Sequence, residues 1–135
     1  MKDKYFDLNE NIERLVRTFN KNRNLFIAFD FDHTVADFDS PGDSFPKMED
    51  LLRFLKKQGF MLILFTCAEE AHLKKRIVYC TSHDFAPDYI NENPILNSKK
   101  PHYDILLDDK AGLNEAYQIL VATLNMLNFN YHYKN

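Results

Sequence analysis

Four aspartates in two pairs are the residues of this sequence best suited to chemistry. Asp30 and Asp32 flank Phe31, and Asp108 and Asp109 are adjacent much later in the chain. In an extended segment Asp30 and Asp32 face one side while Phe31 faces the other. Carboxylates that lie close together resist simultaneous ionisation unless a cation neutralises them. Oxygen ligands without a histidine pair or a thiolate favour Mg²⁺, which bridges carboxylates to phosphate, so the pattern predicts a magnesium site for a phosphate monoester.

These polar groups follow short apolar runs, which are typical of strands buried on both faces of a parallel sheet. The runs cover residues 25–29, 60–65 and 104–107, with a weaker strand at 88–90. Apolar residues at spacings of three and four predict helices at 8–19, 48–58 and 113–127. The length and the mixture of charges predict a surface helix at 69–83. The alternation predicts an α/β fold with a Rossmann-like, doubly wound parallel sheet. Ligands of such sheets bind at the carboxyl ends of the strands, where the aspartates are expected.

With these residues in place, the sequence resembles the haloacid dehalogenase-like phosphatase superfamily over roughly residues 25–110. Its first motif, DxDx[TV], stands at residues 30–34 as DFDHT. The second, a Ser or Thr after a strand, is matched by Thr66, and the third, a lysine, by Lys99 or Lys100. The acidic pair at 108–109 matches the fourth. The resemblance implies a three-layer α/β/α fold.

The resemblance also implies a role for each motif residue. Asp30 would attack phosphorus to form an aspartyl-phosphate, and Asp32 would protonate the leaving oxygen and then deprotonate the hydrolytic water. Mg²⁺ would be held by Asp30, by the backbone carbonyl of Asp32 and by Asp108, with Asp109 near the metal or reaching it through water. Thr66 and Lys100, preferred over Lys99, would bind the phosphate, and Thr34 is assigned with them.

Each motif residue also has a structural interpretation. DxD sequences occur in nucleotide-sugar transferases and calcium loops. Thr66 with Glu69 forms the pattern of a helix capping box. Asp109 could cap the last helix, Thr34 could be a turn residue, and the lysines could be solvated surface. Cys67 is not expected to act as a nucleophile, because thiol phosphatases need an arginine six residues later.

Two other functional classes fit the same elements. A signalling receiver domain has a similar size and acidic cluster, but its acceptor aspartate stands alone, unlike Asp30 and Asp32. A noncatalytic phosphate-binding or assembly protein could retain the phosphatase scaffold. Measured turnover separates these classes from a hydrolase.

Composition limits the partners. The 135 residues are expected to form a single domain, 1–135, and 45% of them are apolar. The formal charge of −3, without a long Lys/Arg run, argues against nucleic-acid binding. The first residues lack an apolar signal core and no run is long enough to span a membrane. Two cysteines without a disulfide pattern fit the cytoplasm.

The short spacing between the motifs leaves no room for a sizeable cap domain. About thirty residues separate Thr34 from Thr66, and they must also build a helix and a strand. We therefore expect an open site for a small phosphorylated substrate, a nucleotide or a sugar phosphate, which a second copy of the chain could cover. Acidic residues in the 37–43 loop favour such a monophosphate over nucleic-acid ends. The aromatic tail at 129–133 is a candidate for a contact between copies.

Overall fold

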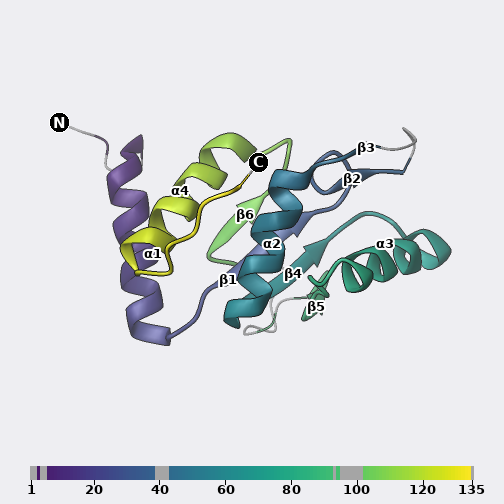
Figure 1. Ribbon diagram of the computed structural model, residues 1–135, viewed down its shortest axis with the longest axis horizontal. Coiled ribbons are helices and arrows are strands. Elements are labelled where there is room, and N and C mark those ends of the chain that lie inside the picture. Colours follow the sequence, from purple (N-terminus) through teal and green to yellow (C-terminus); the bar gives the residue numbers. More distant parts are fainter. Residues whose placement is uncertain (1–2, 4–5, 39–42, 93, 95–101, 135) are drawn as a thin grey trace.

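The computed structural model describes residues 3, 6–38, 43–92, 94 and 102–134 of the chain (Figure 1). Every predicted helix and strand is confirmed, with ends that move by a few residues. The elements in chain order are α1 (Leu8–Asn22), β1 (Phe26–Asp30), β2 (Ala36–Asp37), β3 (Asp43–Ser44), α2 (Pro46–Gln58), β4 (Met61–Phe65), α3 (Glu70–Ser82), β5 (Tyr89–Ile90), β6 (Ile105–Leu107) and α4 (Leu113–Met126).

The main sheet has the order β5-β4-β1-β6, and all its neighbouring strands are parallel. The chain adds β4 and then β5 on one side of β1 and places β6 on the other, so the strand order reverses at β1, as predicted for a doubly wound sheet. Its strand beginnings are anchored by acids of the neighbouring segments: the Phe26 N–H donates to Asp104 at 2.7 Å and the Leu62 N–H to Asp88 at 2.8 Å. These bonds fix the register that brings the carboxyl ends of β1, β4 and β6 together.

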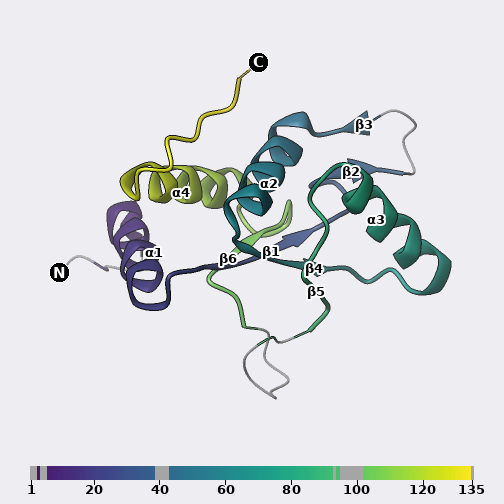
Figure 2. The ribbon, with the colours of Figure 1, turned by 60° about the horizontal axis from the view of Figure 1, so that its bottom comes forward.

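The apolar runs that predicted β1 and β4 form the centre of the core. Ile27, Phe29, Leu62 and Leu64 are fully buried, and the Phe29 ring meets Phe85 edge-on at 6.4 Å between centroids. Figure 2 shows α2, α3 and α4 on one side of the sheet, and α1 packs against α4. Burial of these strands is the main source of stability in such a fold.

The opposite face of the sheet is contacted by the segment that leads into β6. Phe26 meets the His102 ring at 5.8 Å, and Phe65 meets Tyr103 at 6.1 Å between centroids. The described residues 102–104, which lead into β6, lie on this side in Figure 2. The helices α2, α3 and α4 therefore build one layer, while His102 and Tyr103 contact the other face.

The segment between β1 and β4 contains α2 and a small hairpin, and no large cap domain in its described residues. Pro46 begins α2, and Gly59 ends it in a left-handed conformation with φ of 91°. The hairpin pairs β2 with β3 antiparallel and was not predicted, because strands of two residues have no measurable period. The expected capless architecture is confirmed for the described residues.

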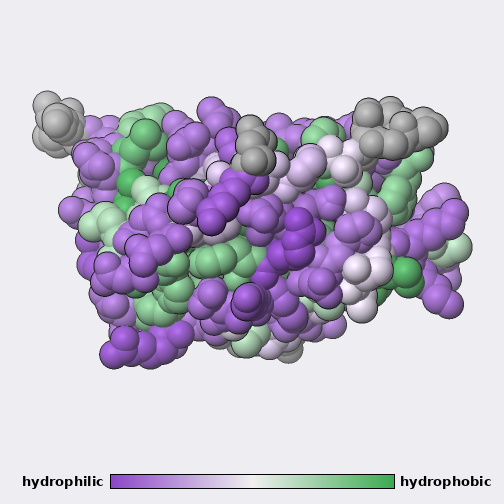
Figure 3. Space-filling model, viewed as in Figure 1, coloured by the Kyte–Doolittle hydropathy of each residue, from purple (hydrophilic) through white to green (hydrophobic). Residues whose placement is uncertain are grey.

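The aromatic tail folds back on its own domain. Tyr131 is 4% exposed, donates a hydrogen bond from its hydroxyl to Asp50 at 2.8 Å, and packs on Phe54. The face in Figure 3 is mostly hydrophilic, with apolar areas broken up by polar residues. No helix within the described ranges combines the length and the hydropathy that a bilayer-crossing segment needs.

Candidate metal and phosphate site

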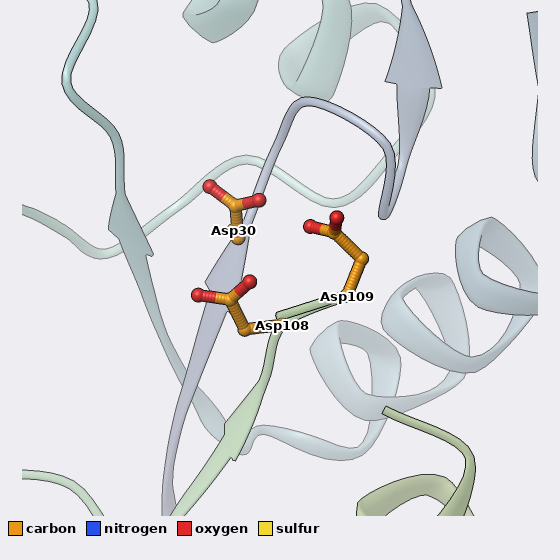
Figure 4. A group of neighbouring side chains, drawn as sticks. All are labelled: Asp30, Asp108 and Asp109. Atoms are coloured by element: carbon orange, nitrogen blue, oxygen red, sulfur yellow. The ribbon is translucent and has the colours of Figure 1, made fainter. Parts of the chain in front are cut away.

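Three carboxylates meet at the carboxyl edge of the sheet (Figure 4). Asp30 ends β1, and Asp108 and Asp109 follow β6, which pairs with β1 in parallel register. One carboxylate oxygen from each side chain lies within 4.8 Å of the others. The turn after β6 fixes Asp108, because its side chain accepts the Lys110 N–H at 3.0 Å. The predicted convergence of Asp30 with the acidic pair is therefore present.

Burial and like charges raise the pKa of Asp30 to about 7. Removal of its carboxylate from water is the largest cause, and the negative charge of Asp108 is the second. The hydrogen bond to Asp109 and the Asp109 charge add to the shift, whereas the Phe31 N–H opposes it. A positive ion between the three side chains would remove the repulsion.

The three carboxylates fit a hard divalent cation. Octahedral Mg²⁺ holds oxygens at about 2.1 Å, so two ligands on opposite sides lie about 4.2 Å apart. The oxygens of Asp30, Asp108 and Asp109 lie within 4.8 Å, so small side-chain rotations are sufficient to close on the ion. Carboxylate oxygen is also the ligand type that Mg²⁺ prefers.

The raised pKa of Asp30 predicts how stability depends on pH without metal. Between pH 3.8 and about 7 the folded state holds a proton on Asp30 that the unfolded state has lost. The free energy of unfolding therefore falls as pH rises through this window, and the effect of Asp30 levels off above it. We expect Asp30→Asn to gain stability relative to the wild type across the same range, measured by urea unfolding in EDTA. A constant difference from pH 4 to 8 would contradict the shift.

Thr34 supports Asp109. It is 1% exposed, accepts the Asp109 N–H at 3.0 Å, and donates its hydroxyl to the Asp109 carboxylate at 3.3 Å. Because the hydroxyl is occupied on both sides, Thr34 holds the acidic pair in place. The phosphate-binding role expected for Thr34 stays a prediction.

Thr34→Val should weaken divalent cation binding and destabilise the fold by about 1 kcal/mol, because it removes both hydrogen bonds between the buried Thr34 hydroxyl and the exposed Asp109. Thr123→Val is the matched control, since Thr123 is also buried but donates to Ile119 within α4 at 2.8 Å. Calorimetric titration with Mg²⁺ should show a weaker Kd for Thr34→Val alone. An equal loss in both variants would assign Thr34 to packing.

Asp32 is held by an arginine that the motifs do not include. Arg76 of α3 contacts both carboxylate oxygens of Asp32, the shortest contact being 2.9 Å, and its guanidinium lies over the rings of Phe31 and Phe38 at 5.6 and 5.3 Å. The Arg76 side chain is 11% exposed and that of Asp32 is 42% exposed. The Asp32 carboxylate thus does not join the cluster of the other three. Arg76 shares one face of α3 with Leu73 and the buried Cys80, at spacings of three and four residues. A charged residue on this face was the signal in the sequence that could have identified Arg76.

Thr66 follows β4 at the same edge of the sheet. Its backbone N–H donates to the Asn91 side chain at 2.9 Å, and its hydroxyl accepts the Ala68 N–H at 3.1 Å. The capping box with Glu69 is not formed, because Glu69 itself is the residue before α3. The hydroxyl therefore orders the turn at the end of β4. Lys99 and Lys100, the predicted phosphate-binding lysines, lie outside the described residues.

The comparisons with known proteins inform the fold. No family model matches the sequence. No curated protein matches it either. A solved structure described as a conserved protein from Bacteroides thetaiotaomicron superimposes with a TM-score of 0.62 at 21% sequence identity, covering 81% of this chain and 99% of that one. At this identity the likeness shows a shared α/β fold, which extends over nearly the whole length of the Bacteroides protein.

Proposed function

We propose that the protein is a Mg²⁺-dependent phosphomonoester hydrolase of the haloacid dehalogenase-like type, with Asp30 as the nucleophile. The observation that supports this proposal is the convergence of Asp30 with Asp108 and Asp109 at the carboxyl edge of two adjacent parallel strands. This edge is where open α/β sheets bind their ligands. The order of the four motifs along the sequence adds to it.

The cluster divides into groups with different tasks. Asp30, Asp108 and the backbone carbonyl of Asp32 would hold Mg²⁺, with Asp109 beside it. Bound there, the cation supplies positive charge for the carboxylates and for the phosphate oxygens. Thr34 keeps Asp109 in position through its two hydrogen bonds.

The chemistry needs two carboxylates in sequence. An oxygen of Asp30 attacks phosphorus, the ester P–O bond breaks, and Asp32 gives its proton to the leaving oxygen. Asp32 then takes a proton from water as that water attacks the aspartyl-phosphate, which releases inorganic phosphate and restores Asp30. The nucleophilic form of Asp30 is its ionised carboxylate, and the raised pKa disfavours that form in the metal-free protein. A bound cation would lower this pKa, so metal binding and ionisation of Asp30 favour each other.

Asp32 must leave its ion pair before it can act as an acid. The pair with Arg76 holds a charged carboxylate, whereas proton donation needs a neutral one. Substrate would therefore compete with Asp32 for Arg76 when it enters. If this exchange does not occur, the same arrangement fits a noncatalytic phosphate-binding protein, the second candidate function.

The substrate class follows from the open site. A small phosphorylated molecule, a nucleotide or a sugar phosphate, remains the proposed substrate because the described residues form no large cap over the three carboxylates. The cytoplasm is the proposed compartment, based on two cysteines that are both free. A second copy of the chain is the proposed cover for the site, although Tyr131 of the tail is committed to its own domain.

Hydrolysis of p-nitrophenyl phosphate with Mg²⁺ and with EDTA tests the proposal. We expect Mg²⁺-dependent release of p-nitrophenolate that falls at least about tenfold in EDTA and returns with added Mg²⁺. A panel of nucleotides and sugar phosphates serves as a second set of substrates. Metal binding without turnover of any phosphate would support the noncatalytic candidate instead.

A further inference from the structure

A groove of about 860 Å³ runs along α3, and Arg76, which pairs with Asp32, is among its lining residues. Its volume falls within the range of about 300–1,000 Å³ typical of small-molecule sites. Rings and cations line it together, and the residues that matter here are Phe38, His72, Lys74, Lys75, Arg76 and Tyr79. This composition suits an organic anion.

The lysines of this groove are available for a ligand. Lys74 and Lys75 are both exposed, and neither takes part in an ion pair formed within the described residues. Arg76 is nearly buried and is already occupied by Asp32 at 2.9 Å. Lys74 and Lys75 therefore add positive charge to the groove, without an ion pair among the described residues.

Arg76 links the groove to Asp32, because it lines the groove and pairs with the Asp32 carboxylate. In the proposed reaction the leaving oxygen stands opposite the attacking oxygen of Asp30 and next to the proton donor, Asp32. Arg76 contacts Asp32 directly and also lines the groove. A leaving group that passes Asp32 would thus extend along α3.

We infer that the α3 groove binds a second anionic group carried by the leaving group of the substrate. The preferred substrate is then a small bisphosphate or a phosphomonoester with a carboxylate, held by Lys74 and Lys75 at its far end. This inference rests on the proposed function, which places the reacting phosphate at Asp30 and the second anionic group in the groove. The same anion would draw Arg76 away from Asp32 and free the carboxyl group for proton transfer.

The test compares glucose 1,6-bisphosphate with its two monophosphates by calorimetry. The Asp30→Asn protein with Mg²⁺ is used so that no ligand is consumed. We expect the bisphosphate to bind about tenfold more tightly than the better monophosphate, because a second charged group gains charge-assisted contacts. In the additional double substitution Lys74→Gln and Lys75→Gln, this preference should fall to about twofold or less.

A double substitution elsewhere, Lys21→Gln and Lys57→Gln, makes the same change in net charge and should keep the tenfold preference. A bisphosphate that binds no better than the monophosphates, or that binds equally well without the groove lysines, overturns the inference. Turnover by the wild type is measured separately on the same three compounds. If neither these compounds nor p-nitrophenyl phosphate nor the phosphate panel is hydrolysed and the preference still depends on Lys74 and Lys75, the groove stands as an anion site and the proposed hydrolase is wrong.

Discussion

Asp30→Asn is expected to lower kcat for p-nitrophenyl phosphate by at least about a thousandfold, because an amide cannot attack phosphorus as a carboxylate does. The substitution keeps the shape of the side chain at the end of β1. It also removes one of three like charges, so the metal-free protein should unfold at a higher temperature at pH 8 than the wild type. Loss of activity together with gained stability separates a chemical role from a folding defect.

The control for this substitution is Asp84→Asn. Asp84 is exposed and has a left-handed backbone with φ of 66°, which asparagine adopts readily. Its activity should stay within twofold of the wild type. The Asp30→Asn protein is purified free of contaminating phosphatases. If it retains full Mg²⁺-dependent turnover, Asp30 is not the nucleophile and the proposed covalent step is wrong.

The parts of the fold that the sequence predicted are those with strong local patterns. The runs of β1 and β4 contain only apolar residues before their polar ends, and the spacing in α2 puts Leu51, Leu52 and Leu55 on one buried face. The β2–β3 hairpin lacks such a pattern, since each of its strands has two residues. Its pairing comes from backbone hydrogen bonds after the chain has turned, which no local period reports.

The candidate site divides in the same way. The meeting of Asp30 with Asp108 and Asp109 follows from a general rule about the carboxyl ends of parallel strands, and it was predicted. The partners of Thr34 and Asp32 depend on side chains 75 and 44 residues away. Such long-range contacts depend on the packing of α3 and the final turn, so the sequence alone predicted neither the contact of Thr34 with Asp109 nor the contact of Arg76 with Asp32.

The ion pair of Arg76 with Asp32 leads to a prediction that depends on the leaving group. Asp32→Asn should lower kcat by about 10²–10⁴ for a sugar phosphate, whose alkoxide leaves poorly without a proton. The loss should be much smaller in the first step with p-nitrophenyl phosphate, since p-nitrophenolate leaves readily without one. Burst kinetics with the activated ester should then show the aspartyl-phosphate accumulating, because the same variant also lacks the base for its hydrolysis.

Arg76→Met distinguishes general acid–base chemistry from simple loss of the ion pair. Methionine keeps an apolar contact with Phe31 and Phe38 but releases Asp32, which can still transfer a proton. Any loss of kcat in this variant should therefore be the same for the sugar phosphate and for p-nitrophenyl phosphate, even if its KM rises. If Asp32→Asn instead slowed both esters equally without a burst, Asp32 would act only as an anchor for Arg76. The leaving-group dependence, rather than the size of the loss, therefore decides whether Asp32 transfers a proton.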